Sequence, residues 1–470
     1  MRKTKIVCTI GPASNNEETL TRLSLAGMNV ARLNFSHGTH EDHKRNIELI
    51  KKVREKLDLP IGILLDTKGP EYRIGIFEDG KVILNANDEF TFTVEDITGN
   101  SERVSISYKK LPRELDCGDK VLLNNGLVIL EVTETNDTEV KCKVIVGGVV
   151  SNRKSMSFPN KVLKQKYLSD NDKSDLLFGI GQDIDFIACS FVSCKQDILD
   201  VKEFLRANNA PDIDIIAKIE NQAGIDNIDE ICEECDGIMI GRGDMGVEIP
   251  YEKLPAIQKH LITKCRMLGK RVITATEMLE SMISNPRPTR AEISDVANAV
   301  YDGTSAVMLS GETAAGQYPV EAVAAMARIT EETEKNICYD KRYNVDDFKI
   351  RNTLDAISHA TCGMACDISA KAIVVCSLSG MTARMVSRFR PSVDIIGLTT
   401  NARAVYKLSL SWGVTPVLTE DYPSIEVLFY VAKKTAQKTF NLTKGDKIII
   451  TGGATNGSSG NTDLIKIETV

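Results

Sequence analysis

The sequence predicts an α/β protein built on a closed (β/α)8 TIM barrel, with an inserted all-β lid domain and a C-terminal α/β domain. Three observations predict this fold. Short apolar runs alternate with amphipathic stretches, one long segment reads instead as alternating β-branched strands, and a further block of strand and helix signals follows the last run. A chain of 470 residues is long enough for two to four domains.

Eight apolar runs are the expected barrel strands. Most are followed by an amphipathic stretch such as "SNNEETLTRLSLAG", which is typical of a helix. Strands that alternate with helices in this way form parallel sheets, and eight such units close into a barrel. The runs occupy residues 5–10, 28–35, 61–65, 186–192, 213–219, 237–240, 271–276 and 306–309.

The interruption between the third and fourth runs is the expected lid. Stretches such as "EFTFTVEDI" alternate apolar and polar residues, and pairs such as Asn125-Gly126 mark turns between strands. We expect residues 1–69 and 168–340 to form the barrel and residues 70–167 to form the lid. Residues 341–470, which begin within the polar link "YDKRYNVDDFKIRNT", are the expected C-terminal α/β domain.

Composition limits the partners and the location. A formal net charge of −7 argues against nucleic acid as a partner, and no apolar run is long enough to span a membrane. The 12 cysteines are scattered, and "MRKTKIVCTIGPAS" does not resemble a secretory signal, so we expect a cytoplasmic protein with reduced thiols. In "SHGTHEDHKRN" we expect His40 and His43 to be solvated on a polar helix.

Polar side chains follow seven of the eight runs. Lys218 and Glu220 are two residues apart at the end of a buried strand, so they share one face. The carboxyl ends of barrel strands form one rim, where active sites lie. We expect both side chains to be solvated at this mouth, the alternative being a buried ion pair. The full set expected at the rim is Arg32, Asn34, Ser36, Asp66, Thr67, Ser190, Lys218, Glu220, Arg242, Asp244, Thr276, Ser310 and Glu312.

The residue types at the rim predict a class of chemistry. Glu220 and Asp244 follow neighbouring strands and are hard ligands that suit Mg²⁺ or Mn²⁺. Arg32 and Lys218 attract an anion, and the backbone N–H at Gly243 is a further donor. This pattern predicts phosphoryl transfer or enolate chemistry. Two alternatives stay open, a lyase or aldolase that forms a Schiff base on Lys218, and a catalytically inactive protein that binds an effector.

The chain resembles the pyruvate kinase family along its whole length. The stretches that carry the resemblance include "LLDTKGPEYRIG", "IIAKIENQAGIDN", "GRGDMGVEIP" and "PRPTRAEISDVANAVYDGTSAVMLSGETAAGQYP". The resemblance implies the same three-part fold and the transfer of phosphate from phosphoenolpyruvate to ADP in glycolysis, giving pyruvate and ATP. It also implies a need for Mg²⁺ (or Mn²⁺) and K⁺, a homotetramer, and regulation by a phosphorylated effector through the C-terminal domain.

The resemblance further implies a role for each matching residue. Glu220 and Asp244 would hold the divalent cation, and Lys218 would steady the transferring phosphoryl group. The substrate would contact Arg32, Lys218, Gly243, Asp244 and Thr276, and the nucleotide would contact Arg73, Asn34 and His37. Potassium would bind Asn34, Ser36, Asp66 and Thr67. Candidates for the proton relay to the enolate are Thr276, Ser310 and Glu312, and candidates for the effector phosphate are Ser377, Ser379, Gly380 and Thr382.

Glu71 matches the acidic variant that accompanies potassium dependence in this family. Some positions depart from the family's usual residues and weaken the assignment of lid contacts. These positions are Asn124, Asn125 and Asn171 around the lid, and Gly241 and Glu277 beside the catalytic positions.

Overall fold

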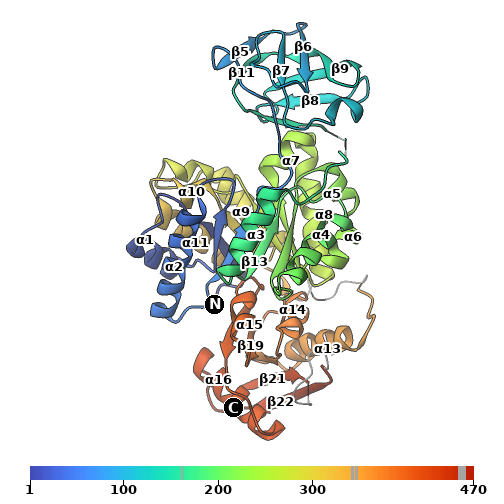
Figure 1. Ribbon diagram of the computed structural model, residues 1–470. Coiled ribbons are helices and arrows are strands. Elements are labelled where there is room, and N and C mark those ends of the chain that lie inside the picture. Colours follow the sequence, from blue (N-terminus) through green and yellow to red (C-terminus); the bar gives the residue numbers. More distant parts are fainter. Residues whose placement is uncertain (160, 162, 340–342, 344–347, 454–461) are drawn as a thin grey trace.

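A computed structural model describes residues 1–159, 161, 163–339, 343, 348–453 and 462–470 of the chain. Figure 1 shows three parts in a row, with the β lid at one end, the barrel in the middle and the C-terminal domain at the other end. This arrangement confirms the predicted fold class. The predicted boundary at residue 340 lies outside the described residues, and the exact domain limits stay predictions.

Eight parallel strands close the barrel in the order β1-β17-β16-β15-β14-β13-β3-β2. Each coincides with one of the eight predicted apolar runs. Every neighbouring pair is parallel, and β1 pairs with both β2 and β17, which closes the sheet. The strands are β1 (Lys5–Thr9), β2 (Val30–Asn34), β3 (Gly62–Asp66), β13 (Phe186–Cys189), β14 (Asp214–Ile219), β15 (Gly237–Gly241), β16 (Arg271–Ala275) and β17 (Ala306–Leu309).

Helices follow the strands because capping residues start them where the sequence turns polar. Thr39, Ser169 and Thr289 each form a capping box that satisfies the first free N–H groups of a helix. The helices around the barrel include α1 (Glu17–Ala26), α2 (His40–Leu57), α3 (Asp170–Gly181), α4 (Lys195–Ala207), α6 (Ile228–Glu234), α8 (Leu254–Met267), α9 (Arg290–Asp302) and α11 (Pro319–Lys335). Short segments at the strand ends are α5 (Gln222–Asp226), α7 (Arg242–Glu248), α10 (Gly311–Ala314), η2 (Tyr251–Lys253) and η3 (Glu280–Ile283).

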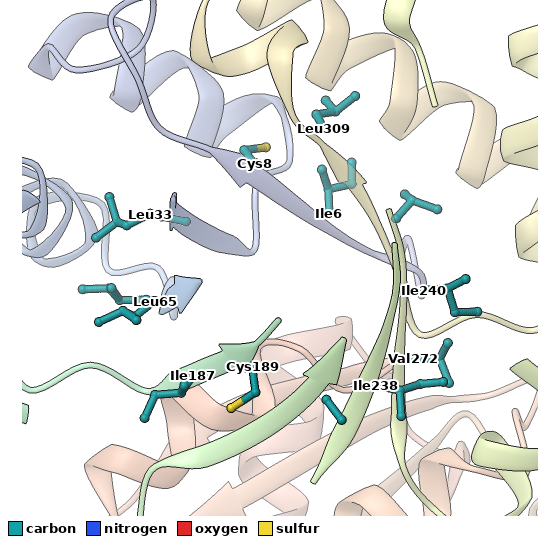
Figure 2. Close-up of a cluster of buried hydrophobic side chains, with 14 of the residues drawn as sticks. Ile6, Cys8, Leu33, Leu65, Ile187, Cys189, Ile238, Ile240, Val272 and Leu309 are labelled. Atoms are coloured by element: carbon teal, nitrogen blue, oxygen red, sulfur yellow. The ribbon is translucent and has the colours of Figure 1, made fainter. Parts of the chain in front are cut away.

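Alternation along the strands divides the barrel into two apolar layers. Side chains such as Ile6, Leu65 and Ile240 point outward and pack beneath the helices (Figure 2). The residues between them point inward and fill the barrel itself, as Val7 and Ile216 do. Because each strand keeps this alternation to its end, the polar residues that follow the inward positions also point into the barrel.

The lid is a seven-stranded sheet in the order β4-β12-β8-β9-β10-β6-β7, with a separate pair β11-β5. Its core includes Phe90 and Phe92, which are fully buried. The predicted turn before Gly126 is present, and Asn124 and Asn125 adopt the left-handed conformation that asparagine tolerates. The lid elements are β4 (Tyr72–Arg73), β5 (Lys81–Leu84), β6 (Glu89–Thr93), β7 (Arg103–Ser105), η1 (Leu111–Arg113), β8 (Lys120–Leu123), β9 (Val128–Thr135), β10 (Glu139–Val146), β11 (Gly148–Ser151) and β12 (Ser155–Ser157).

The C-terminal domain contains a five-stranded sheet in the order β20-β19-β18-β21-β22, in which only β22 is antiparallel to its neighbour. Leu410 of this domain reaches the apolar interior of the barrel at the amino ends of its strands. The elements are α13 (Thr353–Asp367), β18 (Ala372–Cys376), α14 (Met381–Ser387), β19 (Asp394–Thr399), α15 (Ala402–Leu408), β20 (Val414–Leu418), α16 (Ile425–Phe440), β21 (Lys447–Gly452) and β22 (Leu464–Thr469). None of the helices in the described ranges is long and apolar enough to cross a membrane.

Candidate active site

Strand β14 places a lysine and a glutamate on the inner face of the barrel mouth. Ile215, Ala217 and Ile219 belong to the outer apolar layer, whereas Ile216 lies inside the barrel. Lys218 and Glu220 continue the inward positions of Ile216, as the strand period requires. The predicted shared face of these two residues is therefore present.

The structure corrects the expectation that Lys218 and Glu220 are solvated. Lys218 is 8% exposed and Glu220 is 1% exposed. The Lys218 Nζ lies 3.1 Å from Glu220 Oε1 and 3.1 Å from Asp66 Oδ1, and it donates a hydrogen bond to Ser190 Oγ at 2.7 Å. The pair is a buried ion pair, and Asp66 is part of it. Burial alone would lower the pKa of Lys218, but Asp66 and Glu220 outweigh it and raise that pKa, so the lysine is protonated.

Both carboxylate oxygens of Glu220 have partners. Oε1 faces Lys218, and Oε2 accepts a hydrogen bond from the Phe191 backbone N–H at 2.9 Å. Phe191 has a φ of 56°, which is an unusual conformation for an aromatic residue and aims its N–H at this oxygen. Burial and the charges of Asp244 and Asp66 raise the pKa of Glu220 to about 7, although Lys218 opposes the shift.

Arg32 completes the cationic floor of the mouth. Its Nε donates to Asp66 Oδ2 at 2.6 Å, and its Nη1 donates to Thr9 Oγ1 at 2.8 Å. Asp66 therefore lies between two cations, which lower its pKa against the opposing effect of burial. Ser190, which follows β13, donates to the Thr67 carbonyl at 2.6 Å and so ties the ends of β13 and β3 together.

A cavity of about 940 Å³ lies between this floor and the lid. Lys218 and Asp244 line it from the barrel, and Lys154 and Asn124 line it from the lid. Asp244 is exposed, in contrast to Glu220. The predicted site residues that line the cavity are Arg32, Asn34, Ser36, His37, Arg73, Lys218 and Asp244. Ser190 lines the cavity as well, whereas its lining does not include Asp66, Thr67, Glu220, Gly243, Thr276, Ser310 or Glu312.

The turn after β16 is held in an unusual conformation by Arg242. Thr276 and Glu277 have φ values of 66° and 54°, which are uncommon for residues other than glycine and most costly for the β-branched Thr276. The Arg242 guanidinium donates to the Thr276 carbonyl at 2.6 Å and to the Glu277 carbonyl at 2.9 Å, while Asp295 binds it at 2.7 Å. The Gly243 N–H donates to Thr276 Oγ1 at 2.8 Å, so these two predicted substrate contacts are neighbours.

Ser310 and Glu312 are near the rim but have structural contacts. Glu312 is buried, and its oxygens accept hydrogen bonds from the backbone N–H groups of Leu279 at 3.0 Å and Ser310 at 2.7 Å. Glu312 thus connects the loop after β16 to the end of β17. Among the described residues, Ser310 Oγ is a buried atom without a hydrogen-bond partner.

The predicted potassium and nucleotide residues lie on the β2 and β4 side of the mouth. Glu71 pairs with Lys68 at 3.1 Å and also with Arg73. His37 lines the cavity, and its carbonyl is hydrogen bonded to His43 Nε2 at 2.9 Å. The expectation that His43 is solvated was wrong, because its ring is buried and stacks on Phe35 with centroids 3.9 Å apart.

The predicted effector loop precedes α14. Gly380, with a φ of 78°, occupies the N-cap position of this helix, and no side chain caps it. Thr382 is buried and its hydroxyl lies 2.7 Å from that of Thr462. Ser377 lies at the end of β18, where its N–H donates to the Leu398 carbonyl, and Ser379 lies two residues further on.

The donor set at the barrel mouth fits a divalent cation of the magnesium type. Glu220 and Asp244 are hard oxygen ligands, and they are close enough that the charge of Asp244 helps to raise the pKa of Glu220. Within the described ranges, no group of three or more His, Cys, Asp or Glu side chains could hold a metal by itself. Water and substrate oxygens would therefore supply the remaining ligands, which is the usual coordination of Mg²⁺.

Comparisons with known proteins give one answer for the whole chain. Residues 1–323 match the family model described as pyruvate kinase, barrel domain, and residues 355–468 match the model described as pyruvate kinase, alpha/beta domain. The chain belongs to the pyruvate kinase family. It is 48% identical over 474 residues to a pyruvate kinase of Staphylococcus epidermidis, covering 100% of this chain and 81% of that relative. It is 45% identical to a pyruvate kinase of Clostridium acetobutylicum, with 100% of both chains covered. A crystal structure of a pyruvate kinase from Cryptosporidium parvum superposes with a TM-score of 0.94 at 40% identity, covering 100% of this chain and 96% of that one.

Membership of the pyruvate kinase family makes this protein a phosphotransferase and agrees with the state of Lys218. A Schiff-base lysine must lose its proton near neutral pH, whereas Asp66 and Glu220 keep Lys218 charged. The lyase alternative is therefore not supported by the geometry.

Some residues at the pyruvate kinase mouth were missed by sequence reasoning. Tyr167 donates to the Ser190 carbonyl at 2.7 Å, and Phe191 supplies the N–H to Glu220. Neither contact has a sequence signal, because both depend on backbone conformation. Glu248 lines the cavity one helical turn after Asp244, and burial with the charges of Asp244 and Glu220 raises its pKa to about 7. The spacing of four residues on α7 was a signal that could have identified Glu248.

Proposed function

We propose that this protein transfers the phosphoryl group of phosphoenolpyruvate to ADP, giving pyruvate and ATP in cytoplasmic glycolysis. The observation that supports this most strongly is the clamp around Lys218. A lysine kept protonated by Asp66 and Glu220 lies beside Arg32 on the floor of a large cavity. A fixed cation at that place stabilises negative charge that develops as a phosphoryl group leaves an enolate.

The neighbouring residues bind and orient the substrate. Arg32 is placed to hold a phosphate oxygen, because its guanidinium is fixed by Asp66 and Thr9. The Gly243 N–H and the Thr276 hydroxyl, which contact each other, are placed to hold the substrate carboxylate. Thr276, Ser310 and Glu312 are candidates for delivering a proton to the enolate with water, although Glu312 also has the structural contacts described above.

Glu220 and Asp244 would hold Mg²⁺ or Mn²⁺, which supplies a Lewis acid at the phosphoryl oxygens. Lys218 pairs with Glu220 and favours the charged form of this carboxylate against the opposing effect of burial. Asp244 is exposed in the cavity and is accessible to the cation directly.

Potassium activation follows from the charges near Glu71. Glu71 neutralises part of the charge of Lys68 and Arg73, so less positive charge faces the phosphate, and K⁺ would restore it. The oxygen ligands proposed for K⁺ are those of Asn34, Ser36, Asp66 and Thr67. We also propose that Arg73, Asn34 and His37 contact the nucleotide, that a phosphorylated effector binds Ser377, Ser379, Gly380 and Thr382, and that the protein is a homotetramer.

A coupled assay of pyruvate formation from phosphoenolpyruvate and ADP tests the proposal. We expect turnover with Mg²⁺ and K⁺ together, a large loss without the divalent cation, and a marked loss when K⁺ is replaced by tetramethylammonium. Absence of pyruvate under the complete conditions would refute the proposed reaction. A full rate without any monovalent cation would refute only the potassium site.

A further inference from the structure

At the end of β15, on its inner face, a glycine lies against the Glu220 side chain. Met239 points into the barrel, so Gly241, two residues later, points inward as well. A Cβ atom at Gly241 would lie 2.6 Å from Glu220 Oε1, 2.7 Å from its Cγ and 3.1 Å from its Cδ. Glu220 therefore occupies the space that any other residue at position 241 would fill.

This space keeps the Glu220 carboxylate away from the cavity. Glu220 is 1% exposed and does not line the cavity, whereas Asp244, which follows the same strand, is exposed there. Both Glu220 oxygens are already in contact with partners, Lys218 and the Phe191 N–H. For both carboxylates to hold one cation, Glu220 must turn an oxygen toward the cavity, which moves the carboxylate out of its buried position beside Lys218 and the Phe191 N–H.

We propose that Gly241 is a positioning residue that weakens divalent-cation binding by making room for a retracted Glu220. The inference depends on the proposed cation site of Glu220 and Asp244. A cation binds only the fraction of molecules in which Glu220 faces the cavity, so the retracted fraction raises the apparent dissociation constant in proportion. The absence of a side chain at Gly241 thus weakens the affinity of the substrate-free enzyme for the divalent cation.

The substitution Gly241→Ala tests this directly. The atoms that a new Cβ would meet are at the end of the flexible Glu220 side chain, so this side chain, and not the strand, has to move. We expect Mn²⁺ to bind the substrate-free G241A variant about tenfold more tightly than the wild type, the scale on which residues that orient a metal ligand usually act. The dissociation constant is measured by electron paramagnetic resonance of free Mn²⁺. Unchanged or weaker Mn²⁺ binding would overturn the proposal.

Gly246→Ala is the matched control, because this glycine is on α7 and its added Cβ would meet Leu254 at 3.3 Å and not Glu220. We expect its Mn²⁺ affinity to equal that of the wild type. Equal tightening in G246A and G241A would also overturn the proposal, because it would show an effect of α7 and not of the Glu220 space.

A double-mutant cycle, in which unfolding is measured without metal, separates this inference from the proposed function. In EDTA, G241A should lower the unfolding midpoint when Glu220 is present and should not lower it when Glu220 is replaced by alanine. Equal effects in both backgrounds would refute the contact. Separately, unchanged Mn²⁺ binding in Asp244→Asn would refute the proposed cation site, while the cycle would still report whether Gly241 and Glu220 interact.

Discussion

At the scale of single residues, burial and charge act in opposite directions on the groups at the barrel mouth. Burial alone would lower the pKa of Lys218 and favour its neutral form, but Asp66 and Glu220 raise this pKa and keep the lysine protonated. Burial dominates at Glu220, whose pKa rises to about 7 despite the same ion pair. The lysine is therefore a fixed positive charge, and the glutamate is a group whose charge depends on pH and on a bound cation.

Replacing Lys218 by methionine should abolish phosphoryl transfer and leave divalent-cation binding in place. Methionine keeps much of the side-chain volume but has no charge, so kcat should fall by about a thousandfold, the upper effect of removing one electrostatic donor. The coupled assay measures kcat, and Mn²⁺ titration measures binding. Lys173→Met is the control, because Lys173 is partly exposed and pairs with its neighbour Asp170 on the surface of α3. A K218M variant with wild-type turnover would exclude the proposed role.

Divalent-cation binding should weaken as the pH falls below about 7, because Glu220 must lose its proton to act as a ligand. Above that pH the carboxylate is charged and affinity should be constant. Below it, the dissociation constant for Mn²⁺ should rise by about tenfold per pH unit. The variant Glu248→Gln should keep this slope with its midpoint at lower pH, because the charges of Glu248 and Glu220 repel each other and the variant removes that repulsion. A flat profile from pH 8 to pH 5.5 would show that Glu220 does not titrate there.

At the scale of elements, α9 fixes the turn that carries Thr276. Asp295 of α9 binds Arg242. Arg242 donates hydrogen bonds to the Thr276 and Glu277 carbonyls and so holds the backbone of these two residues in the left-handed conformation. The strained backbone conformation of this turn persists because these hydrogen bonds stabilise it. The substrate contact at Thr276 therefore depends on an ion pair that lies on the helical layer of the barrel.

Asp295→Asn should lower kcat/KM for phosphoenolpyruvate by about tenfold to a hundredfold, because a small displacement of Thr276 misplaces the substrate. The fold should remain, since only the charge of the side chain changes. The control Asp302→Asn is on the same helix, where the largely buried Asp302 side chain pairs with the exposed Lys259, away from Arg242. Steady-state kinetics and the thermal midpoint of both variants check the prediction. Equal kinetics for D295N and wild type would show that Arg242 holds the turn without this pair.

The sequence predicted the elements better than the contacts between them. Apolar runs and capping residues determine where strands and helices form, and strand periodicity placed Lys218 and Glu220 on the inner face. Sequence reasoning expected these two side chains to be solvated, because it could not show that Asp66 and Ser190 from neighbouring strands surround the lysine. The positive φ of Phe191 likewise results from tertiary packing and leaves no pattern in the chain.

At the scale of the whole molecule, the C-terminal domain closes the end of the barrel opposite to the active site. Lys407 pairs with Asp214 at 2.6 Å, and Tyr406 stacks under the Arg54 guanidinium at 3.7 Å. Leu410 enters the apolar interior of the barrel. The amino ends of the strands thus contact the domain that carries the proposed effector loop, and their carboxyl ends carry the proposed catalytic residues.

Leu410→Ala should destabilise the protein by about 3 kcal/mol, because it leaves a cavity in a completely buried position at the junction of two domains. Trp412 is the only tryptophan and is buried two residues away, so its fluorescence reports unfolding at this junction. Urea denaturation should show a lower midpoint, with an early loss of the tryptophan signal relative to circular dichroism if the domains separate first. The control Leu418→Ala, at a position 54% exposed, should stay within about 0.5 kcal/mol of the wild type. An unchanged midpoint in L410A would show that the ion pairs alone hold the C-terminal domain on the barrel.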